Sequence, residues 1–422
     1  MAISRMRAHH VLFGWINFAL TAPAVYLWLG LPLVMRQQGW SGAEIGLFQL
    51  AGLPAVFKLF LALPIERWRS GHRPYLHWAW LTGGGYLLAL LSLAALGADT
   101  HKGILFALTL LAALCATWAD IPVNALAIRL FPPEERPRAG GVRAAATFAG
   151  AVVGGGAMLL VQQAFDWTTP FLFLGLCLVA ALGLLGFVHE DEDVSCPRRS
   201  APLAVWCGFF RQAGAGIWTV ALLGYFPFVA AAWIYLKPLL LDRGFAATEV
   251  AWIAGVGGGA LGALASFAAG LVPRARVLRA LPLSAGANAL ALVLLAAAAG
   301  YGSQTWLVAA AAFLALAMGV ASTFAFALMM EFARDGWRAA DYGLQASLFT
   351  LGRILIAPPA GLLLDRLGYP GMLAALAVAA LAFALLISAR RRFGFPLVTP
   401  APDSLGRSPR NARVELRATP TL

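Results

Sequence analysis

Long apolar runs, separated by short polar or charged segments, make up most of this chain. An α-helix rises 1.5 Å per residue, so about 20 apolar residues are enough to cross the hydrocarbon core of a membrane. The pattern therefore predicts an all-α polytopic membrane protein with twelve transmembrane helices. Their expected ranges are 11–35, 43–65, 75–97, 103–131, 141–163, 168–188, 214–241, 247–271, 278–299, 305–332, 340–364 and 369–389.

A weak internal repeat divides these helices into two sets of six. Gly39 and Glu44 follow the first predicted span, and Gly244 and Glu249 follow the seventh with the same five-residue spacing. Two related halves are typical of secondary transporters. We expect four units: an N-terminal six-helix bundle at 1–189, a cytoplasmic linker at 190–211, a C-terminal six-helix bundle at 212–393 and a disordered cytoplasmic tail at 394–422.

Composition and charge support this interpretation and give the chain an orientation. Of the 422 residues, 61% are hydrophobic and only 12% are charged, whereas about 25% of a soluble domain is charged. Up to Arg392, nineteen Lys and Arg residues flank the spans on one side and four on the other. The positive-inside rule then predicts that both termini are cytoplasmic, in a bacterial inner membrane. The net charge of +12 therefore needs no nucleic-acid partner.

Asp120 is the residue that most needs an explanation, because it lies about halfway through the fourth predicted span. A carboxylate there costs about 2.5 kcal/mol or more unless it is paired, protonated or facing water. Asn124 lies one turn later on the same helix face, and Lys58 lies at a similar depth in the second span. Two interpretations remain open: a structural ion pair between Lys58 and Asp120, or a switch in which Asp120 takes up a proton when a cavity opens.

Arg353 is a second candidate, near the middle of the eleventh span and without an acid at the same depth in its half. It either reaches a partner elsewhere or faces water and attracts an anionic substrate. Tyr225 and Phe226 precede Pro227 and either shape a ring-binding pocket or pack in the ordinary way. Arg143 is expected to reach the cytoplasmic interface. Further candidates for the wall of a substrate cavity are Gln49, Trp118, Tyr342 and Gln345.

Several separated motifs resemble one transporter family. The run from Gly30 to Trp68, which includes GAEIGLFQLAGLPAVFKLF, is similar to the first helical hairpin of AmpG-type permeases of the major facilitator superfamily. ADIPVNALAIRLFPPEER resembles their fourth helix, and YLKPLLLDRGFAATEVAWIAG resembles their turn between helices seven and eight. Muropeptide permeases carry a second acid and an arginine where this chain has Asn124 and Ala127. ALAIRL and DYGLQASLFTLGR look closer to RhtX/FptX-type siderophore importers.

This resemblance implies a monomeric, proton-coupled importer that moves a siderophore or iron-siderophore complex by alternating access. The alternatives are a muropeptide permease, a drug or metabolite efflux protein, and a non-transporting sensor or membrane enzyme. The sequence has no HExxH motif, clustered His pair or ATP-binding P-loop. Its four cysteines form no CxxC pattern. We therefore expect no metal, cofactor or enzymatic activity, and the expected partners are a small-molecule substrate, protons and the lipid bilayer.

Overall fold

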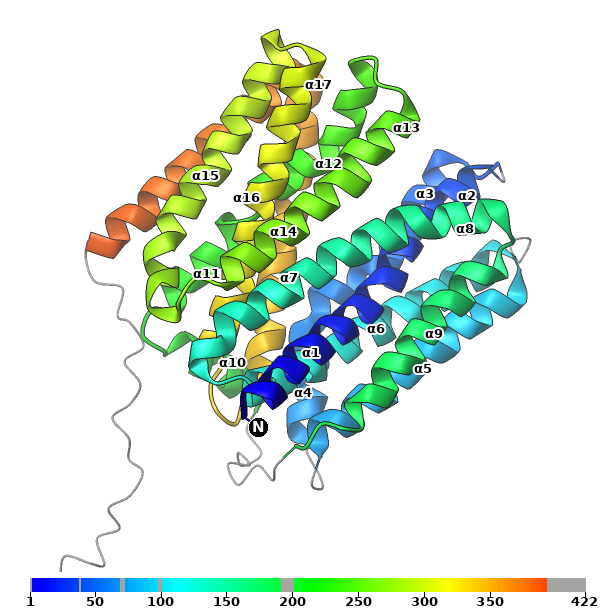
Figure 1. The fold of residues 1–422 in the computed structure, drawn as a ribbon, viewed down its shortest axis with the longest axis vertical. Helices are drawn as coiled ribbons and strands as arrows, with labels where there is room; N and C mark the ends of the chain where they lie inside the picture. Colours follow the sequence, from blue (N-terminus) through cyan, green and yellow to red (C-terminus); the bar gives the residue numbers. More distant parts are fainter. Residues whose placement is uncertain (1, 38, 69–72, 98–100, 191–200, 393–422) are drawn as a thin grey trace, which may run out of the picture.

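The structure is a computed structural model that describes residues 2–37, 39–68, 73–97, 101–190 and 201–392. Every regular element within these ranges is a helix, as predicted. The predicted tail at 394–422 and residues 191–200 of the predicted linker at 190–211 lie outside the described residues. Figure 1 shows two groups of helices lying side by side, one made from the first part of the chain and one from the second.

The first group consists of nine α-helical segments that form six spans. Four short 3-10 or π-helical segments belong to three of these spans, so one span can contain several elements. The bounds are α1 Ala2–Val25, η1 Tyr26–Gly30, α2 Leu31–Gln37, α3 Gly42–Phe48, η2 Gln49–Phe57, α4 Lys58–Arg67, α5 Pro74–Leu96, α6 Lys102–Leu130, η3 Pro133–Glu135, α7 Arg136–Val152, η4 Val153–Ala157, α8 Met158–Ala164 and α9 Thr168–Leu185.

The second group begins with a short helix, Pro202–Phe210, that lies within the range predicted as a linker, 190–211. Its seventh predicted span is broken at Tyr225 and Phe226, because Pro227 starts a new helix there. The bounds are α10 Pro202–Phe210, α11 Ala215–Gly224, α12 Pro227–Asp242, α13 Ala247–Val250, η5 Ala251–Gly257, α14 Gly258–Gly270, α15 Arg274–Tyr301, α16 Gln304–Glu331 and α17 Arg338–Arg392.

The described residues contain 11 helical stretches that are long and apolar enough to cross a membrane. The last of them, Arg338–Ala389, has 52 residues, which is enough for two crossings. Its backbone turns at Gly368, where φ is 66°. A positive φ strains residues that carry a Cβ, so glycine suits this turn. Division at Gly368 gives the twelve predicted helices.

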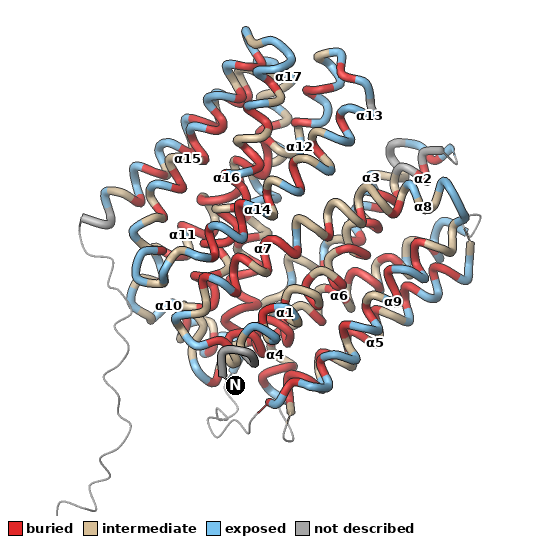
Figure 2. Tube along the Cα trace, in the orientation of Figure 1, coloured by how far each residue is buried: buried red, intermediate tan, exposed pale blue. Residues whose placement is uncertain are grey.

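The groups differ in how their helices are buried (Figure 2). In the most apolar part of α16, 67% of residues are buried, against 22% in the span formed by α3, η2 and α4. Both groups also carry many exposed leucine and phenylalanine side chains. An apolar surface of this kind suits contact with lipid, because lipid tails are as apolar as these side chains.

Glycines bring the two groups into close contact along α7. A Cβ at Gly140 would lie 2.7 Å from the carbonyl oxygen of Thr323 on α16, and one at Gly141 would lie 2.7 Å from that of Ser266 on α14. Either contact is too short for a real side chain. Small residues allow helix backbones to approach closely in membranes, so α7 is the main element of the first group that packs against α14 and α16.

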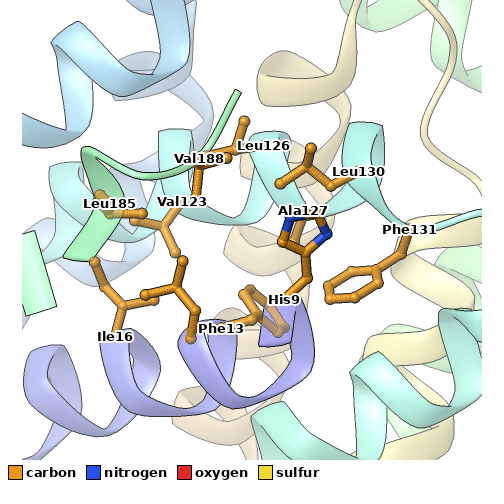
Figure 3. Close-up of a pocket in the computed structure, with 11 residues that line it drawn as sticks. His9, Phe13, Ile16, Val123, Leu126, Ala127, Leu130, Phe131, Leu185 and Val188 are labelled. Atoms are coloured by element: carbon orange, nitrogen blue, oxygen red, sulfur yellow. The ribbon is translucent and has the colours of Figure 1, made fainter. Parts of the chain in front are cut away.

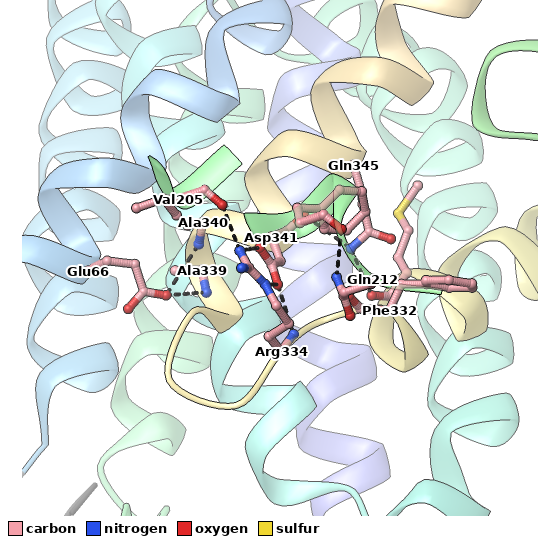
Figure 4. A network of polar contacts seen from close by, with 11 residues as sticks. Glu66, Val205, Gln212, Phe332, Arg334, Ala339, Ala340, Asp341 and Gln345 are labelled. Atoms are coloured by element: carbon pink, nitrogen blue, oxygen red, sulfur yellow. Dashed lines mark hydrogen bonds and ion pairs between the residues drawn. The ribbon is translucent and has the colours of Figure 1, made fainter. Parts of the chain in front are cut away.

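The start of α1 and the end of α17 lie at one end of the bundle, at the lower left in Figure 1. We call this end the terminal face. Here Glu66 at the end of α4 accepts hydrogen bonds from the backbone N–H groups of Ala339 (2.6 Å) and Ala340 (3.2 Å) at the start of α17, as Figure 4 shows. A carboxylate at a helix N-terminus is stabilised by unpaired N–H groups and by the helix dipole.

Charged residues join the two groups at the same end. Glu331 at the end of α16 pairs with Arg136 of α7 at 2.8 Å and with Arg274 of α15. Within the second group, Arg334 pairs with Asp341 at 2.6 Å, and its Nη2 donates to the carbonyl oxygen of Val205 on α10 at 2.9 Å (Figure 4). The terminal face is therefore closed by hydrogen bonds and ion pairs that cross from one group to the other.

Candidate functional site

The centre of the site is the carboxylate of Asp120 on α6. It accepts hydrogen bonds from Lys58 Nζ at 2.5 Å, Tyr342 Oη at 2.7 Å, Asn124 Nδ2 at 2.9 Å and Arg143 Nη2 at 3.0 Å. Both carboxylate oxygens are satisfied, and two of the four donors are cationic. These contacts offset the cost of placing a carboxylate deep in an apolar helix.

Lys58 reaches Asp120 from an irregular point in its span. The 3-10 segment η2 ends at Phe57 and the α-helix α4 begins at Lys58. The backbone N–H of Leu59 donates a hydrogen bond of 2.9 Å to Ser347 Oγ on α17 of the other group. A 3-10 stretch within a helix often marks a functional hinge. The sequence predicted that Lys58 and Asp120 could meet, and they do.

Arg143 was expected at the cytoplasmic interface, and that expectation is wrong. Its side chain is only 8% exposed. Besides its bond to Asp120, its Nε donates to Asn17 Oδ1 on α1 at 3.3 Å, and its guanidinium carbon lies 3.9 Å from the ring centroid of Phe326. Arg143 lies on a turn of α7 close to the terminal face. Its side chain still points inward, because the glycines of α7 pack against the second group. The sequence signal that we missed was a single acid with two cations available at similar depth.

Tyr342 and Asn124 both donate hydrogen bonds to Asp120. Tyr342 is 2% exposed and is the donor that reaches Asp120 from the second group. Asn124 donates both to the carboxylate and, at 2.6 Å, to the backbone carbonyl of Asp120, and its Oδ1 has no hydrogen-bond partner among the described residues. The cluster of Asp120, Lys58, Arg143, Asn124 and Tyr342 is called the central cluster below.

Arg353 lies apart from the central cluster and is exposed. Within the described part of the chain it has no hydrogen bond or ion pair, and its guanidinium carbon lies 6.0 Å from the ring centroid of Phe226. Phe226 is buried against Phe349, with ring centroids 5.1 Å apart. Of the two sequence interpretations of Arg353, a partner elsewhere is not found among the described residues, and an arginine that faces water stays a prediction.

Two of the predicted cavity residues are committed to contacts inside the second group. The hydroxyl of Tyr225 forms a hydrogen bond with Ser284 on α15. The backbone carbonyl oxygen of Tyr225 accepts a hydrogen bond from Asn288 Nδ2 at 3.0 Å. Gln345 is fully buried: its Oε1 accepts from Trp218 Nε1 at 2.6 Å and its Nε2 donates to two backbone carbonyls (Figure 4). We therefore leave both residues out of the proposed binding site, because their polar atoms are already used.

Gln49 and Trp118 also lie away from the central cluster. Gln49 is exposed, and its Nε2 donates to the carbonyl oxygen of Trp28 at 3.3 Å. Trp118 packs against Trp78 on α5, with ring centroids 5.5 Å apart. Its side chain therefore lies on the α5 side of α6, although Asp120 is only two residues away. Neither residue contacts a member of the central cluster in the described structure.

A small apolar pocket lies near the terminal face, between α1, α6 and the segment after α9 (Figure 3). Its lining includes His9, Phe13, Leu130 and Val188. None of the predicted site residues lines it. Val123 and Ala127 line it from α6, whereas Asp120 and Asn124 on the same helix do not. The pocket is therefore separate from the charged site.

Comparison with known proteins identifies the family. Residues 12–344 match the family model described as the Major Facilitator Superfamily. The chain belongs to the Major Facilitator Superfamily. The match covers well over half of the 422 residues, and the predicted fold is confirmed. The protein is thus a multi-pass membrane transporter of this superfamily, which agrees with its helical architecture and apolar surface.

Two individual relatives indicate which transporters of the superfamily the chain resembles. An anhydromuropeptide permease of Escherichia coli (strain K12) is 26% identical over 382 residues, which covers 81% of this chain and 73% of the permease. The permease of Escherichia coli O157:H7 gives the same values. These relatives support the resemblance to muropeptide permeases. The finer assignment to the siderophore-importer branch stays a prediction.

Solved structures of superfamily members share the fold. The human organic anion transporter MFSD10 (TETRAN) has a TM-score of 0.72 at 15% identity, with 90% of this chain and 99% of that chain covered. The Escherichia coli fucose:proton symporter FucP has a TM-score of 0.70 at 14% identity, with 90% and 98% covered. At these identities the likeness concerns the fold alone.

Proposed function

We propose that the protein is a proton-coupled importer of a small anionic solute in a bacterial inner membrane, with both termini in the cytoplasm. The observation that carries this proposal is Arg353, an exposed arginine in a transmembrane helix that has no hydrogen bond or ion pair to the described residues. An uncompensated cation at this depth is costly. An anionic cargo would supply the missing counter-charge.

The charges inside the spans favour an anion as the cargo. The central cluster contains one acid, Asp120, and two cations, Lys58 and Arg143. Arg353 adds a third cation without an acid nearby. A site with more cations than acids attracts anions over a distance longer than a hydrogen bond. A cationic cargo would have to overcome the same field.

The central cluster also suggests how a proton and an anion are coupled. When Asp120 takes up a proton, Lys58 and Arg143 lose the negative charge that they share. An anionic group of the cargo then becomes a favourable replacement partner for these two cations. A protonated carboxyl also loses much of its attraction for the hydroxyl of Tyr342, which joins the two groups. Proton and cargo thus favour each other's binding and weaken one bond between the groups.

The anhydromuropeptide permeases make a muropeptide the first candidate cargo. Such a molecule carries carboxylates and is small enough for one binding site between two bundles. A ferric siderophore is the second candidate, because Arg353 lies over the ring of Phe226, and aromatic, anionic ligands suit an arginine beside an aromatic wall. The orientation and the cellular membrane are part of this proposal.

Uptake into proteoliposomes tests the proposed function. We expect a labelled anhydromuropeptide to accumulate when an inward proton gradient is imposed, and a protonophore to abolish the accumulation. At cargo concentrations below the KM, Arg353→Gln should take up about 10- to 100-fold less of the labelled compound, whereas Arg366→Gln on the same helix should retain the uptake, because Arg366 lies at the end of that span. Ferric siderophores and a neutral disaccharide serve as competing cargoes. Equal uptake of the neutral sugar would contradict an anion carrier.

A further inference from the structure

The two cationic sites lie on one face of the same interface. Tyr342, Phe349 and Arg353 on α17 are separated by seven and four residues, which correspond to about two turns and one turn of an α-helix. All three side chains therefore lie on nearly the same side of α17. Tyr342 donates to the central cluster, so Arg353 lies above that cluster by about 16 Å along the helix axis at 1.5 Å per residue.

An aromatic row connects the two positions. The guanidinium of Arg143 lies over Phe326, and the guanidinium of Arg353 lies near Phe226. Phe349 lies between these rings, with centroids 6.0 Å from Phe326 and 5.1 Å from Phe226. Two arginines are thus placed at the opposite ends of a row of three phenylalanines. Side chains along the row offer no polar atom to a ligand.

Each end of the row has an unused capacity to bind an anion. Arg143 Nη1 is buried and has no hydrogen-bond partner among the described residues, and the exposed guanidinium of Arg353 has none either. The side chains of Lys58 and Asp120 are 14% and 15% exposed, so the central cluster is not sealed. A single carboxylate satisfies one end and leaves the other end unpaired.

We infer that the cargo is an elongated molecule with two anionic groups about 12 to 18 Å apart, a spacing set by the rise of α17. One group binds Arg353, the other binds Arg143 and Lys58, and a less polar middle section spans the distance between them. This inference rests on the proposed function and adds the number and spacing of the charges. It also explains why the second group keeps an arginine without an acid.

Synthetic peptides of known charge spacing test the inference. N-succinyl oligoalanines carry a carboxylate at each end, and N-acetyl oligoalanines of equal length carry only one. Each extended residue adds about 3.3 Å, so chains of one to five alanines move the second carboxylate through the required distance. The measurement is binding to the purified full-length protein in lipid nanodiscs by titration calorimetry.

With three or four alanines, we expect the succinylated peptide to bind at least about tenfold more tightly than the acetylated peptide, as for an added hydrogen bond to a charged group. With one alanine, the two should bind alike. Arg353→Gln should remove the advantage of the longer succinylated peptides and leave the binding of the acetylated peptides in place. Arg366→Gln is the matched control and should preserve the advantage.

Other outcomes overturn the inference in distinguishable ways. If the succinylated peptides bind more tightly at every length, general electrostatic attraction explains the result and the spacing is wrong. If both series bind alike and both need Arg353, the anion carrier stands but its cargo has one charge. If Arg353→Gln changes neither series, Arg353 is not an anion site, and the proposed function fails with it. Absence of binding in both series at millimolar concentrations also contradicts the spacing.

Discussion

The two halves of this transporter hold their intramembrane charge in different ways. In the first half, Asp120 is surrounded by four donors, and two of them are the cations Lys58 and Arg143. In the second half, Arg353 is exposed and lies beside Phe226, with no acid bound to it among the residues that the structure describes. A paired charge contributes to the fold, whereas an unpaired and exposed charge is available to a ligand. The same residue types can therefore have opposite roles in one molecule.

Removal of the acid should have the largest effect. We expect Asp120→Asn to abolish uptake, because the amide cannot take up a proton and leaves Lys58 and Arg143 without a counter-charge. Loss of one partner from a buried pair costs about 3 to 5 kcal/mol, so the melting temperature should fall as well. Uptake by proteoliposomes at several pH values, with size-exclusion chromatography to verify folding, measures both effects.

Asp166→Asn is the control for that variant. Asp166 is an exposed acid between η4–α8 and α9, where it accepts hydrogen bonds from the backbone and hydroxyl of Thr169. The Asp166→Asn substitution removes the same charge outside the membrane-spanning segments and should leave uptake unchanged. Normal uptake by Asp120→Asn across the pH range would remove the proton role from Asp120 and return the central cluster to a structural ion pair.

The unpaired arginine should give the second largest effect, of a different kind. We expect Arg353→Gln to raise KM by about 10- to 100-fold, with little change in kcat or melting temperature. This factor corresponds to the free energy of one hydrogen bond to a charged group. Arg353 makes no ion pair to the described residues that the substitution could break. A fall in thermal stability as large as that of Asp120→Asn would show that Arg353 is a structural charge and would end the contrast between the halves.

The hydroxyl of Tyr342 links the two halves and should have a smaller effect. Tyr342→Phe removes one hydrogen bond to the carboxylate of Asp120, which is worth about 1.5 to 3 kcal/mol. We expect uptake to fall several-fold and the terminal face to open more often, because Glu66, Glu331 and Ser347 would then hold it with less help. Distances between spin labels on α4 and α17 measure the opening.

Tyr369→Phe is the matched control on α17. The hydroxyl of Tyr369 donates to Asp242 at 2.7 Å, a contact between exposed residues on the side away from the terminal face. The spin-label distances at the terminal face should not change in this variant. Identical distance distributions for Tyr342→Phe and the unmodified protein would mean that the bond to Asp120 does not contribute to closure.

Gln345 should have the smallest effect on transport and still weaken the fold. Its amide is bonded to Trp218 and to the carbonyl oxygens of Met329 and Asp341. Gln345→Leu leaves the buried indole N–H of Trp218 without its partner, at a cost of about 1 to 3 kcal/mol. We expect a lower melting temperature and unchanged uptake per folded molecule. A changed KM with normal stability would restore Gln345 to the binding site from which we excluded it.

Sequence patterns located the spans because a transmembrane helix needs a long apolar run wherever it packs. The expected ranges therefore agree with the helices to within a few residues for most spans, for example 103–131 against α6 Lys102–Leu130. The sequence also identified Asp120, Lys58 and Arg353, because a charge within an apolar run is costly in any fold. It could not assign direction to side chains near helix ends. Arg143 was misplaced for that reason.

The chain alone thus determined that this is a membrane protein of twelve helices with three costly charges inside its spans. Both results follow from the free energy of transfer of each residue from water to an apolar medium, which depends on local composition. Only the tertiary structure decided which charges meet. Arg143 joins Asp120 because glycines let α7 pack closely against the second half, Tyr225 and Gln345 turn into their own bundle, and Arg353 has no ion-pair partner in the described chain. Pairing depends on the distance between side chains from remote segments, and that distance is set by helix packing.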